Sequence, residues 1–289
     1  MQSELILQVV VNGFLAAGVY MLVAVGLNMI YGVMRVFNYA QGELLMLGMY
    51  AAYWMNVTLN LSPYVSLPAV VPLLFVVGLG IQRVIVAPLF KHRLPPESHV
   101  LTMIGLIFVL QYSAMLAWTS DYRNVVVPIA TTSISIPPFQ VPIGRLIASL
   151  ASVSIAVALF FFFKYSKMGK IIRATCQDRE AAVYMGINID RVEAITFGIG
   201  AALAGVAAGL LLPLYYVNPF AGFPFTIISF IIVTLGGLGN FIGAIVGSLI
   251  IGMIESVVGF FISAEIASAV AFTIFVLVLF LKPSGLFEE

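Results

Sequence analysis

Charged side chains are scarce in this sequence of 289 residues. Only 9% of the residues are Asp, Glu, Lys or Arg, whereas 62% are hydrophobic, and the mean hydropathy is +1.12. A soluble domain averages about 25% charged residues, because it has to cover a hydrated surface. Lipid must therefore be the solvent for most of the outer surface of this chain.

Metal ligands and catalytic sets are also missing. The single cysteine, Cys176, cannot form a disulfide within the chain. His92 and His99 have no acidic or cysteine companions nearby in the sequence, so we predict no metal site and no cofactor. No Ser-His-Asp or paired-carboxylate set can be placed within one membrane leaflet, which argues against an embedded enzyme and predicts no catalytic residue.

Nucleotide and nucleic-acid motifs are absent as well. The glycine cluster at 236–239 is not followed by Lys and Ser or Thr, so it is no phosphate-binding loop. If ATP drives this protein, another subunit hydrolyses it. The basic segments are sparse and interrupted by apolar residues, which argues against nucleic-acid binding.

Long apolar runs separated by short polar breaks make up most of the chain. A helix needs roughly 20 residues to cross a bilayer core of about 30 Å, whereas barrel strands would alternate in character. The runs are apolar on all sides, so we predict an all-α transmembrane bundle of eight or nine spans, forming one domain over residues 1–289. The predicted spans, of which the short seventh is alternatively re-entrant, are 8–32, 44–60, 66–90, 100–118, 145–164, 194–216, 225–238, 241–262 and 266–282.

Positive charges are distributed unevenly among the polar breaks, and cytoplasmic loops carry the excess of Lys and Arg. Most basic residues fall in breaks on one side, at Arg35, Arg83, residues 91–93, residues 164–191 and Lys282. Only Arg123 and Arg145 fall on the other side, near a polar, β-prone loop at 119–143. We therefore predict a multi-pass protein of the cell inner membrane, with a cytoplasmic C-terminus and an outside N-terminus.

Residues 166–193 are the most informative polar segment. Apolar side chains recur at helical spacing opposite basic ones, at Met168, Ile171, Ile172 and Thr175. This pattern predicts an amphipathic helix on the membrane surface. Asp178 suits the N-cap of a second short helix, and Gly186 suits the position that ends it. Asp190 followed by Glu193 is typical of a capping box at the start of the next span.

The second short helix has an apolar face at Ala181, Tyr184 and Met185 that has to be buried. The residues alone leave two alternatives open. The face rests on the protein's own helices, or it docks a cytoplasmic partner.

A resemblance favours the second alternative. Glu180-Ala181-Ala182, followed after three residues by Gly186, resembles the coupling loop of bacterial ABC importer permeases. The match is closer to the LivH-type permeases of branched-chain amino acid ABC transporters. It extends over residues 26–48, 173–192, 233–255 and 281–287. After Gly186 the chain departs from the general importer motif, because Ile195-Thr196-Phe197 stands in place of an I-x-L-P ending.

The resemblance implies a permease subunit that contacts an ATPase through Arg179, Glu180, Ala181, Ala182 and Gly186. It also implies four kinds of partner: a second permease subunit, two cytoplasmic ATP-binding subunits, a periplasmic substrate-binding protein, and an amino acid as cargo. Leu, Ile and Val, or other neutral and hydrophobic amino acids, are the expected substrates. Relatives for urea or amides are an alternative, and an ion-coupled secondary transporter is a more distant one.

Two interruptions of apolar segments indicate a translocation path, at 35–43 and 218–224. Broken membrane helices expose polar groups only where a cavity accepts them. We therefore select Asn28, Asn38, Gln41 and Glu43 as polar candidates for the path. Glu255 is a fifth candidate, because a carboxylate within an apolar span is costly unless it is paired, protonated or facing water. In the alternative, Glu255 is neutral and hydrogen-bonded to a neighbouring helix. In the alternative, 35–43 is an ordinary inner loop with Arg35 and Glu43 paired. The two interruptions differ in sequence, so no internal repeat is predicted.

Small residues recur every four positions in two spans, at Gly239, Gly243 and Gly247 and at Ala201, Gly205 and Gly209. Such stripes let helix backbones approach closely in a membrane. We expect them to serve helix packing rather than ligand binding.

Overall fold

A computed structural model describes residues 2–92, 95–136, 139–282 and 285–287. Arg93 and the Pro283-Ser284 part of the C-terminal motif lie outside these residues. The longer helices are α1 (Gln2–Met34), α2 (Gln41–Leu59), α3 (Pro63–Ile81), α5 (Pro96–Trp118), α7 (Ile143–Tyr165), α10 (Ile189–Leu211), α11 (Phe223–Gly236), α12 (Phe241–Phe261) and α13 (Ala264–Leu281). The shorter elements are η1 (Gln82–Val86), α4 (Ala87–Lys91), α6 (Pro128–Thr131), β1 (Ser133–Ile136), β2 (Phe139–Pro142), α8 (Lys167–Gln177) and α9 (Arg179–Tyr184).

The predicted helical bundle is confirmed, and each predicted apolar span overlaps one of the longer helices. By length and composition, six of the described helical segments can cross a membrane, while α11 and the Ile266–Leu281 part of α13 are apolar but shorter. These eight segments, together with α2 of 19 residues, account for the predicted eight or nine spans, and both α2 and α11 begin after a non-helical segment.

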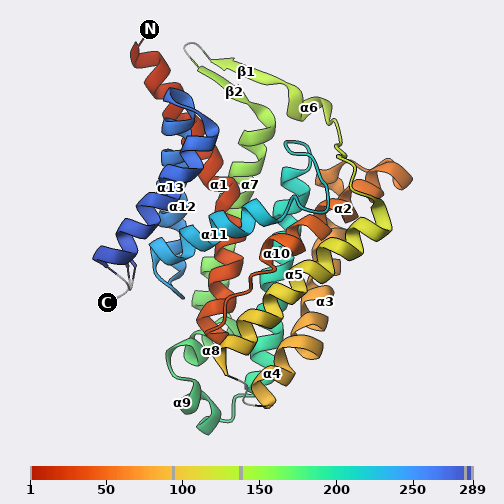
Figure 1. Cartoon of the computed structure of the whole chain (residues 1–289), viewed down its shortest axis with the longest axis vertical. Coiled ribbons are helices and arrows are strands. Elements are labelled where there is room, and N and C mark those ends of the chain that lie inside the picture. The colour runs from red at the N-terminus through yellow and green to blue at the C-terminus, as the bar shows by residue number, and fades with distance from the viewer. Residues whose placement is uncertain (1, 93–94, 137–138, 283–284, 288–289) are drawn as a thin grey trace.

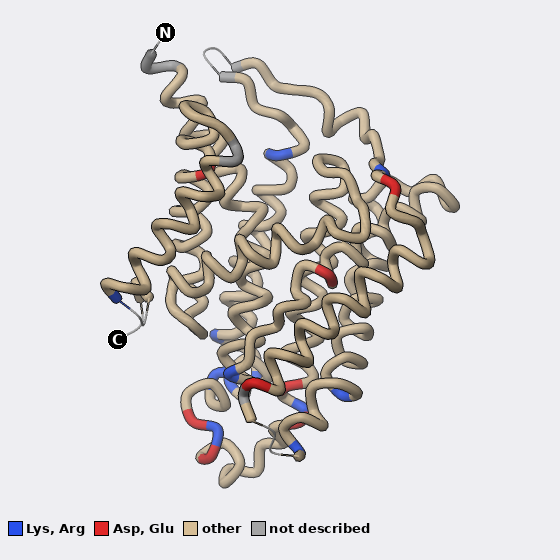
Figure 2. Tube along the Cα trace, viewed as in Figure 1, with Lys and Arg blue, Asp and Glu red and all other residues tan. Residues whose placement is uncertain are grey.

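The two ends of the bundle differ in structure and charge. The N-terminus and the β1–β2 hairpin, which pairs Ser133 with Pro142 and Ile136 with Phe139, lie at one end (Figure 1). Helices α8 and α9 lie at the opposite end. Figure 2 shows that Lys and Arg residues gather at this α8–α9 end. The hairpin falls within the loop at 119–143 that the sequence placed outside.

Helices α1 and α10 form the centre of the bundle. α1 packs most extensively against α12, and α10 packs against α3. Most of both central helices is buried. They approach each other closely at Gly26 and Gly200, where a Cβ built on either glycine would lie 3.0 Å from the carbonyl oxygen of the other.

The small-residue stripes lie at two of these helix contacts. Ala201, Gly205 and Gly209 all face α3. On α12, Gly243 contacts the backbone of Gly236 in α11. The first member of this second stripe needs a correction, since Gly239 lies in the turn before α12 with a φ of +85° rather than on the helix. Its spacing matched a helical stripe because the turn leads directly into the helix.

Candidate coupling helix and translocation sites

Helix α9 is closed at both ends by local hydrogen bonds. The Asp178 Oδ1 accepts a hydrogen bond of 2.9 Å from the Ala181 N–H, as an N-cap does. At the other end Gly186 adopts a φ of +77°, and the Ile187 N–H donates to the Ala182 carbonyl at 3.1 Å. This is the glycine-terminated helix ending that the sequence predicted.

The apolar face of α9 is largely exposed in this chain. Ala182 is buried, but Tyr184 is 87% exposed and Met185 is 82% exposed. The alternative that this face rests on the chain's own helices is therefore wrong for Tyr184 and Met185. Large apolar side chains that a chain leaves uncovered are typical of an interaction surface.

An ion pair ties the first turn of α9 to the first turn of α10. Arg179 pairs with Glu193, whose side chain is only 1% exposed. The guanidinium of Arg179 also lies over the ring of Phe90 in α4, 5.3 Å from its centroid. The predicted capping box is wrong, because Asn188 caps α10 by accepting a bond of 3.0 Å from the Arg191 N–H. Glu193 is used for the ion pair instead.

Helix α8 packs on protein. Its buried side is formed by Gly169, Ile172 and Thr175, and it contacts α7, α1 and α10. The sequence predicted that the apolar side of this helix lies on the membrane surface, whereas it packs on other helices of the chain. An amphipathic pattern does not specify which apolar surface it covers. Burial raises the pKa of the nearby Cys176 thiol to about 11, although the positive charge of Arg35 acts in the opposite direction.

The first chain break, between α1 and α2, is a buried polar network. The Asn38 Nδ2 donates to the Gln41 Oε1 at 3.0 Å, and the Gln41 Nε2 donates to the Gly200 carbonyl at 3.0 Å. The Gly42 N–H donates to the Thr226 hydroxyl at 2.9 Å. Through these bonds the start of α2 is fixed to both α10 and α11.

Glu43 continues this network toward α5. Its Oε1 accepts a bond of 2.9 Å from the Gln111 Nε2, and its side chain is fully buried. Arg35 instead donates to the Cys176 carbonyl at 3.4 Å. The alternative of an inner loop with Arg35 and Glu43 paired is therefore wrong, because Glu43 lies inside the bundle.

The second break, between α10 and α11, has the same local structure as the first. The Asn38 Oδ1 accepts from the N–H two residues later at 3.2 Å, and the Asn218 Oδ1 does the same at 2.8 Å. In each break a glycine follows four residues after the asparagine, so that Asn38–Gly42 and Asn218–Gly222 share the pattern Asn-x-x-x-Gly. The two glycines contact each other, since a Cβ on Gly222 would lie 2.1 Å from the Gly42 carbonyl oxygen.

These breaks belong to an internal repeat of opposite orientation. α1 runs toward the α8–α9 end of the bundle, whereas α10 begins there and runs away from it (Figure 1). In one unit α1 leads through a break to α2 and α3, and in the other α10 leads to α11 and α12. The contacts of α1 with α12 and α11 match those of α10 with α3 and α2. The prediction of no repeat is thus corrected.

Two cavities lie along α1, one toward each end. The one along the N-terminal half of α1, named the outer cavity after the predicted outside N-terminus, has adjoining hollows of about 880 Å³ and 420 Å³, and Glu255 lines the deeper of these. The inner one measures about 800 Å³ and is lined by Asn28, together with Lys164, Lys170 and Arg173. Residues 21–24 of α1, between the two cavities, are buried.

The five path candidates therefore lie in three separate places. Glu255 lies in the outer cavity, Asn28 in the inner one, and the three polar residues of the first break lie in the buried network. Asn28 also holds the turn before α12, because its Oδ1 accepts from the Gly239 N–H at 2.7 Å and its Nδ2 donates to the Asn240 carbonyl at 2.6 Å.

The profile of the family described as "Branched-chain amino acid transport system / permease component" matches residues 9–279. The chain belongs to this permease family. It is 32% identical over 296 residues to the high-affinity branched-chain amino acid transport system permease protein LivH of Salmonella typhimurium, with 97% of this chain and 94% of the relative covered. It is 31% identical to BraD of Pseudomonas aeruginosa, described in the same words, with 97% and 95% covered.

The chain is also similar, more distantly, to a permease protein of another name. It is 28% identical over 154 residues to a probable branched-chain amino acid transport permease protein LivM of Methanocaldococcus jannaschii, covering 47% of this chain and 44% of the relative. No solved structure matches the chain. The family confirms the predicted permease subunit, a transport component and not an enzyme, which works with other parts of a transporter.

Several residues of this permease were not among the candidates from sequence. Gln111, Thr226, Asn218 and Gly222 all take part in the breaks and their contacts. The signal that could have found two of them is the shared Asn-x-x-x-Gly spacing. Gln111 carried the same signal as Glu255, a polar residue within an apolar span, and was overlooked. Thr226 carried a weaker signal, because a threonine hydroxyl commonly bonds within its own helix.

Proposed function

We propose that this permease moves branched-chain or similar neutral, hydrophobic amino acids across the bacterial inner membrane in an ATP-driven importer. The names of its relatives support this cargo. We also propose three kinds of partner: a second permease subunit of the LivM kind, two cytoplasmic ATP-binding subunits and a periplasmic binding protein. The basic α8–α9 end faces the cytoplasm in this proposal, which places the C-terminus there.

Helix α9 is the element through which the ATP-binding subunits act. The coupling residues are Arg179, Glu180, Ala181, Ala182 and Gly186, as proposed from the motif. The exposure of Tyr184 and Met185 supports this role, because two large apolar side chains on a short capped helix form an apolar surface that a partner can bind. Ala182 and Gly186 then serve the helix itself, the first by packing inward and the second by ending it.

The ion pair between Arg179 and Glu193 transmits a displacement of α9 to the core of the bundle. A push on α9 is carried by this pair and by the short connection at 187–188 into α10. From α10 the Gly200 carbonyl is bonded to Gln41 at the first break. A ligand or partner shifts a conformation only if it binds the two states differently, so the ATP-binding subunits must contact α9 differently in their open and closed forms.

The exposed face of α9 is the single observation on which this coupling role depends, and replacing Tyr184 by Asp tests it. A carboxylate at this position should prevent binding to an apolar groove on the partner, because burying an unpaired charge is costly. We expect the variant to insert into the membrane at the normal level but to lose co-purification of the ATP-binding subunits and ATP-driven leucine uptake. Tyr122→Asp is the matched control, since Tyr122 is 76% exposed in the loop at the other end.

Co-purification and uptake at the wild-type level in Tyr184→Asp would contradict the coupling role of α9. Substrate class is tested separately. If purified wild-type importer takes up urea or amides with ATP but no aliphatic amino acid, the proposed cargo is wrong while the coupling role stands.

A further inference from the structure

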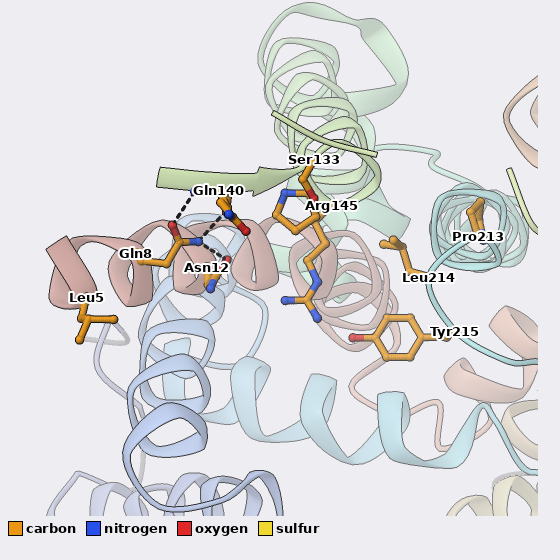
Figure 3. Close-up of a pocket in the computed structure, with 10 residues that line it drawn as sticks. Leu5, Gln8, Asn12, Ser133, Gln140, Arg145, Pro213, Leu214 and Tyr215 are labelled. Carbon is orange, nitrogen blue, oxygen red and sulfur yellow. Dashed lines mark hydrogen bonds between the residues drawn. The ribbon is translucent and has the colours of Figure 1, made fainter. Parts of the chain in front are cut away.

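The outer cavity contains charges of both signs. Its upper hollow is lined by Gln8 and Asn12 of α1, by Arg145 of α7 and by Tyr215, and it opens toward the β hairpin (Figure 3). The deeper hollow shares Asn12, Arg145 and Tyr215 and adds Tyr20 and Glu255. The two hollows therefore form one cleft. From Gln8 to Tyr20 it follows α1 for roughly 18 Å at 1.5 Å per residue.

The two charged groups are not joined to each other. Among the described residues, no ion pair links Arg145 to Glu255, although both line the deeper hollow. The Glu255 Oε2 is buried without a cation beside it, and the Tyr20 hydroxyl is the polar neighbour of this carboxyl group within the described residues. In Figure 3 the guanidinium of Arg145 points across the cleft toward Tyr215. A carboxylate within a membrane span is costly unless it has a partner, so its position in a cavity calls for a cationic ligand.

Apart from Ser256, whose hydroxyl donates to the Val9 carbonyl, the rest of the deeper hollow is apolar. Its remaining wall includes Val9, Leu15, Val19, Leu214 and Phe260. At about 420 Å³ it falls within the range of roughly 300–1,000 Å³ that is typical of small-molecule sites. An anionic group, a cationic group and an aliphatic wall in one cleft match the three parts of an aliphatic α-amino acid.

We propose that the outer cleft is a binding site for the zwitterion of an aliphatic amino acid. Arg145 binds the carboxylate, Glu255 binds the ammonium, and the apolar wall accepts the side chain. This inference rests on the proposed function and deepens it, because it identifies where the cargo first contacts this chain. The deeper hollow ends near the second break, since the rings of Tyr20 and Tyr215 both pack on Phe225.

The test uses the complex of permease and ATP-binding subunits in nanodiscs, without the periplasmic binding protein, so that leucine bound elsewhere does not contribute. It measures competition with radiolabelled leucine. Two competitors each lack one charge: 4-methylpentanoate is leucine without its ammonium, and 3-methylbutylamine is leucine without its carboxylate. Glu255→Gln should weaken leucine binding about tenfold but leave 4-methylpentanoate unchanged, because a charged hydrogen bond is lost only where an ammonium is present. Arg145→Gln should weaken leucine about tenfold and leave 3-methylbutylamine unchanged.

Matched controls separate the cleft from a general effect of charge. Glu97→Gln and Arg83→Gln remove one exposed charge each outside the cleft and should bind all three compounds as the wild type does. Arg145→Lys keeps the positive charge and should restore most of the leucine affinity. The ATPase rate of each purified variant shows that it has folded and assembled.

Two results overturn the inference in distinguishable ways. If the wild-type importer binds and takes up leucine while both Gln variants keep its affinities for all three compounds, the cleft is not the site and the proposed function stands. If the wild-type importer takes up no aliphatic amino acid with ATP, the proposed function fails and the inference fails with it.

Discussion

Replacing Gly222 by Ala tests whether the crossing of the two breaks holds the centre of the bundle together. A Cβ at this position would lie 2.1 Å from the Gly42 carbonyl oxygen and 2.4 Å from the Gly42 carbonyl carbon. Real Cβ contacts essentially never fall below 3.0 Å, so one backbone has to move by about 0.9 Å. No side chain can rotate away to relieve this clash, since both partners are backbone.

Inserting a methyl group into a tightly packed site typically costs about 1–3 kcal/mol. For a domain of a few hundred residues, each kcal/mol lowers the melting temperature by roughly 2–4 °C. We therefore expect Gly222→Ala to lower the melting temperature by about 2 to 12 °C. Gly42→Ala should act similarly, because its Cβ would lie 2.0 Å from the Gly222 carbonyl oxygen.

The assay is thermal unfolding of the purified chain in detergent, followed by the amount that remains monodisperse after heating. Gly80→Ala and Gly105→Ala are the matched controls, since a Cβ on either of these helical glycines meets no atom within 4 Å. Ala is favoured over Gly in a helix by up to about 1 kcal/mol, so these controls should be unchanged or more stable. Equal melting temperatures for all four variants would refute the close contact of the breaks.

Two further predictions concern the α8–α9 end of the bundle. Arg179→Gln should destabilise the chain by roughly 1–3 kcal/mol because it leaves the buried Glu193 without its cation. The double variant with Glu193→Gln should recover part of this loss in thermal unfolding, and a fully additive loss would contradict the pair. Cys176, whose pKa burial raises from 9.0 to about 11, should have about a hundredfold less thiolate at pH 7.5 than an ordinary thiol. N-ethylmaleimide should therefore label the native chain far more slowly than the unfolded chain, and the labelling rate of the native chain should rise as the pH increases toward 11. Mass spectrometry measures both rates, and equal rates for the native and unfolded chains would contradict this prediction.

Local features were predicted well from the sequence. The caps at Asp178 and Gly186 were identified because a helix end depends on a few neighbouring residues. The Asp190–Glu193 capping box was wrong for a related reason: Asn188 was a stronger N-cap two residues earlier. Glu193 was then free to pair with Arg179, a contact outside the capping motif.

The candidate path was predicted in composition but not in arrangement. Buried polar residues stand out in apolar spans, so Asn28, Asn38, Gln41, Glu43 and Glu255 could all be chosen from the sequence. Their partners could not, because Gly200, Thr226 and Gln111 are distant in the chain and unremarkable in type. The repeat was missed since its two halves share only an asparagine and a glycine in each break.

The sequence by itself determined that this chain is a membrane protein, which of its loops carry the basic charge, and to which permease family it belongs. Hydropathy, charge counts and short motifs depend on residues close together, so they can be read without a fold. Only the tertiary structure decided that Tyr184 and Met185 are uncovered, that the two breaks cross at their glycines, and that Arg145 and Glu255 face one cleft. Those facts depend on which helices pack together, and in a uniformly apolar chain the hydrophobic pattern does not specify that choice.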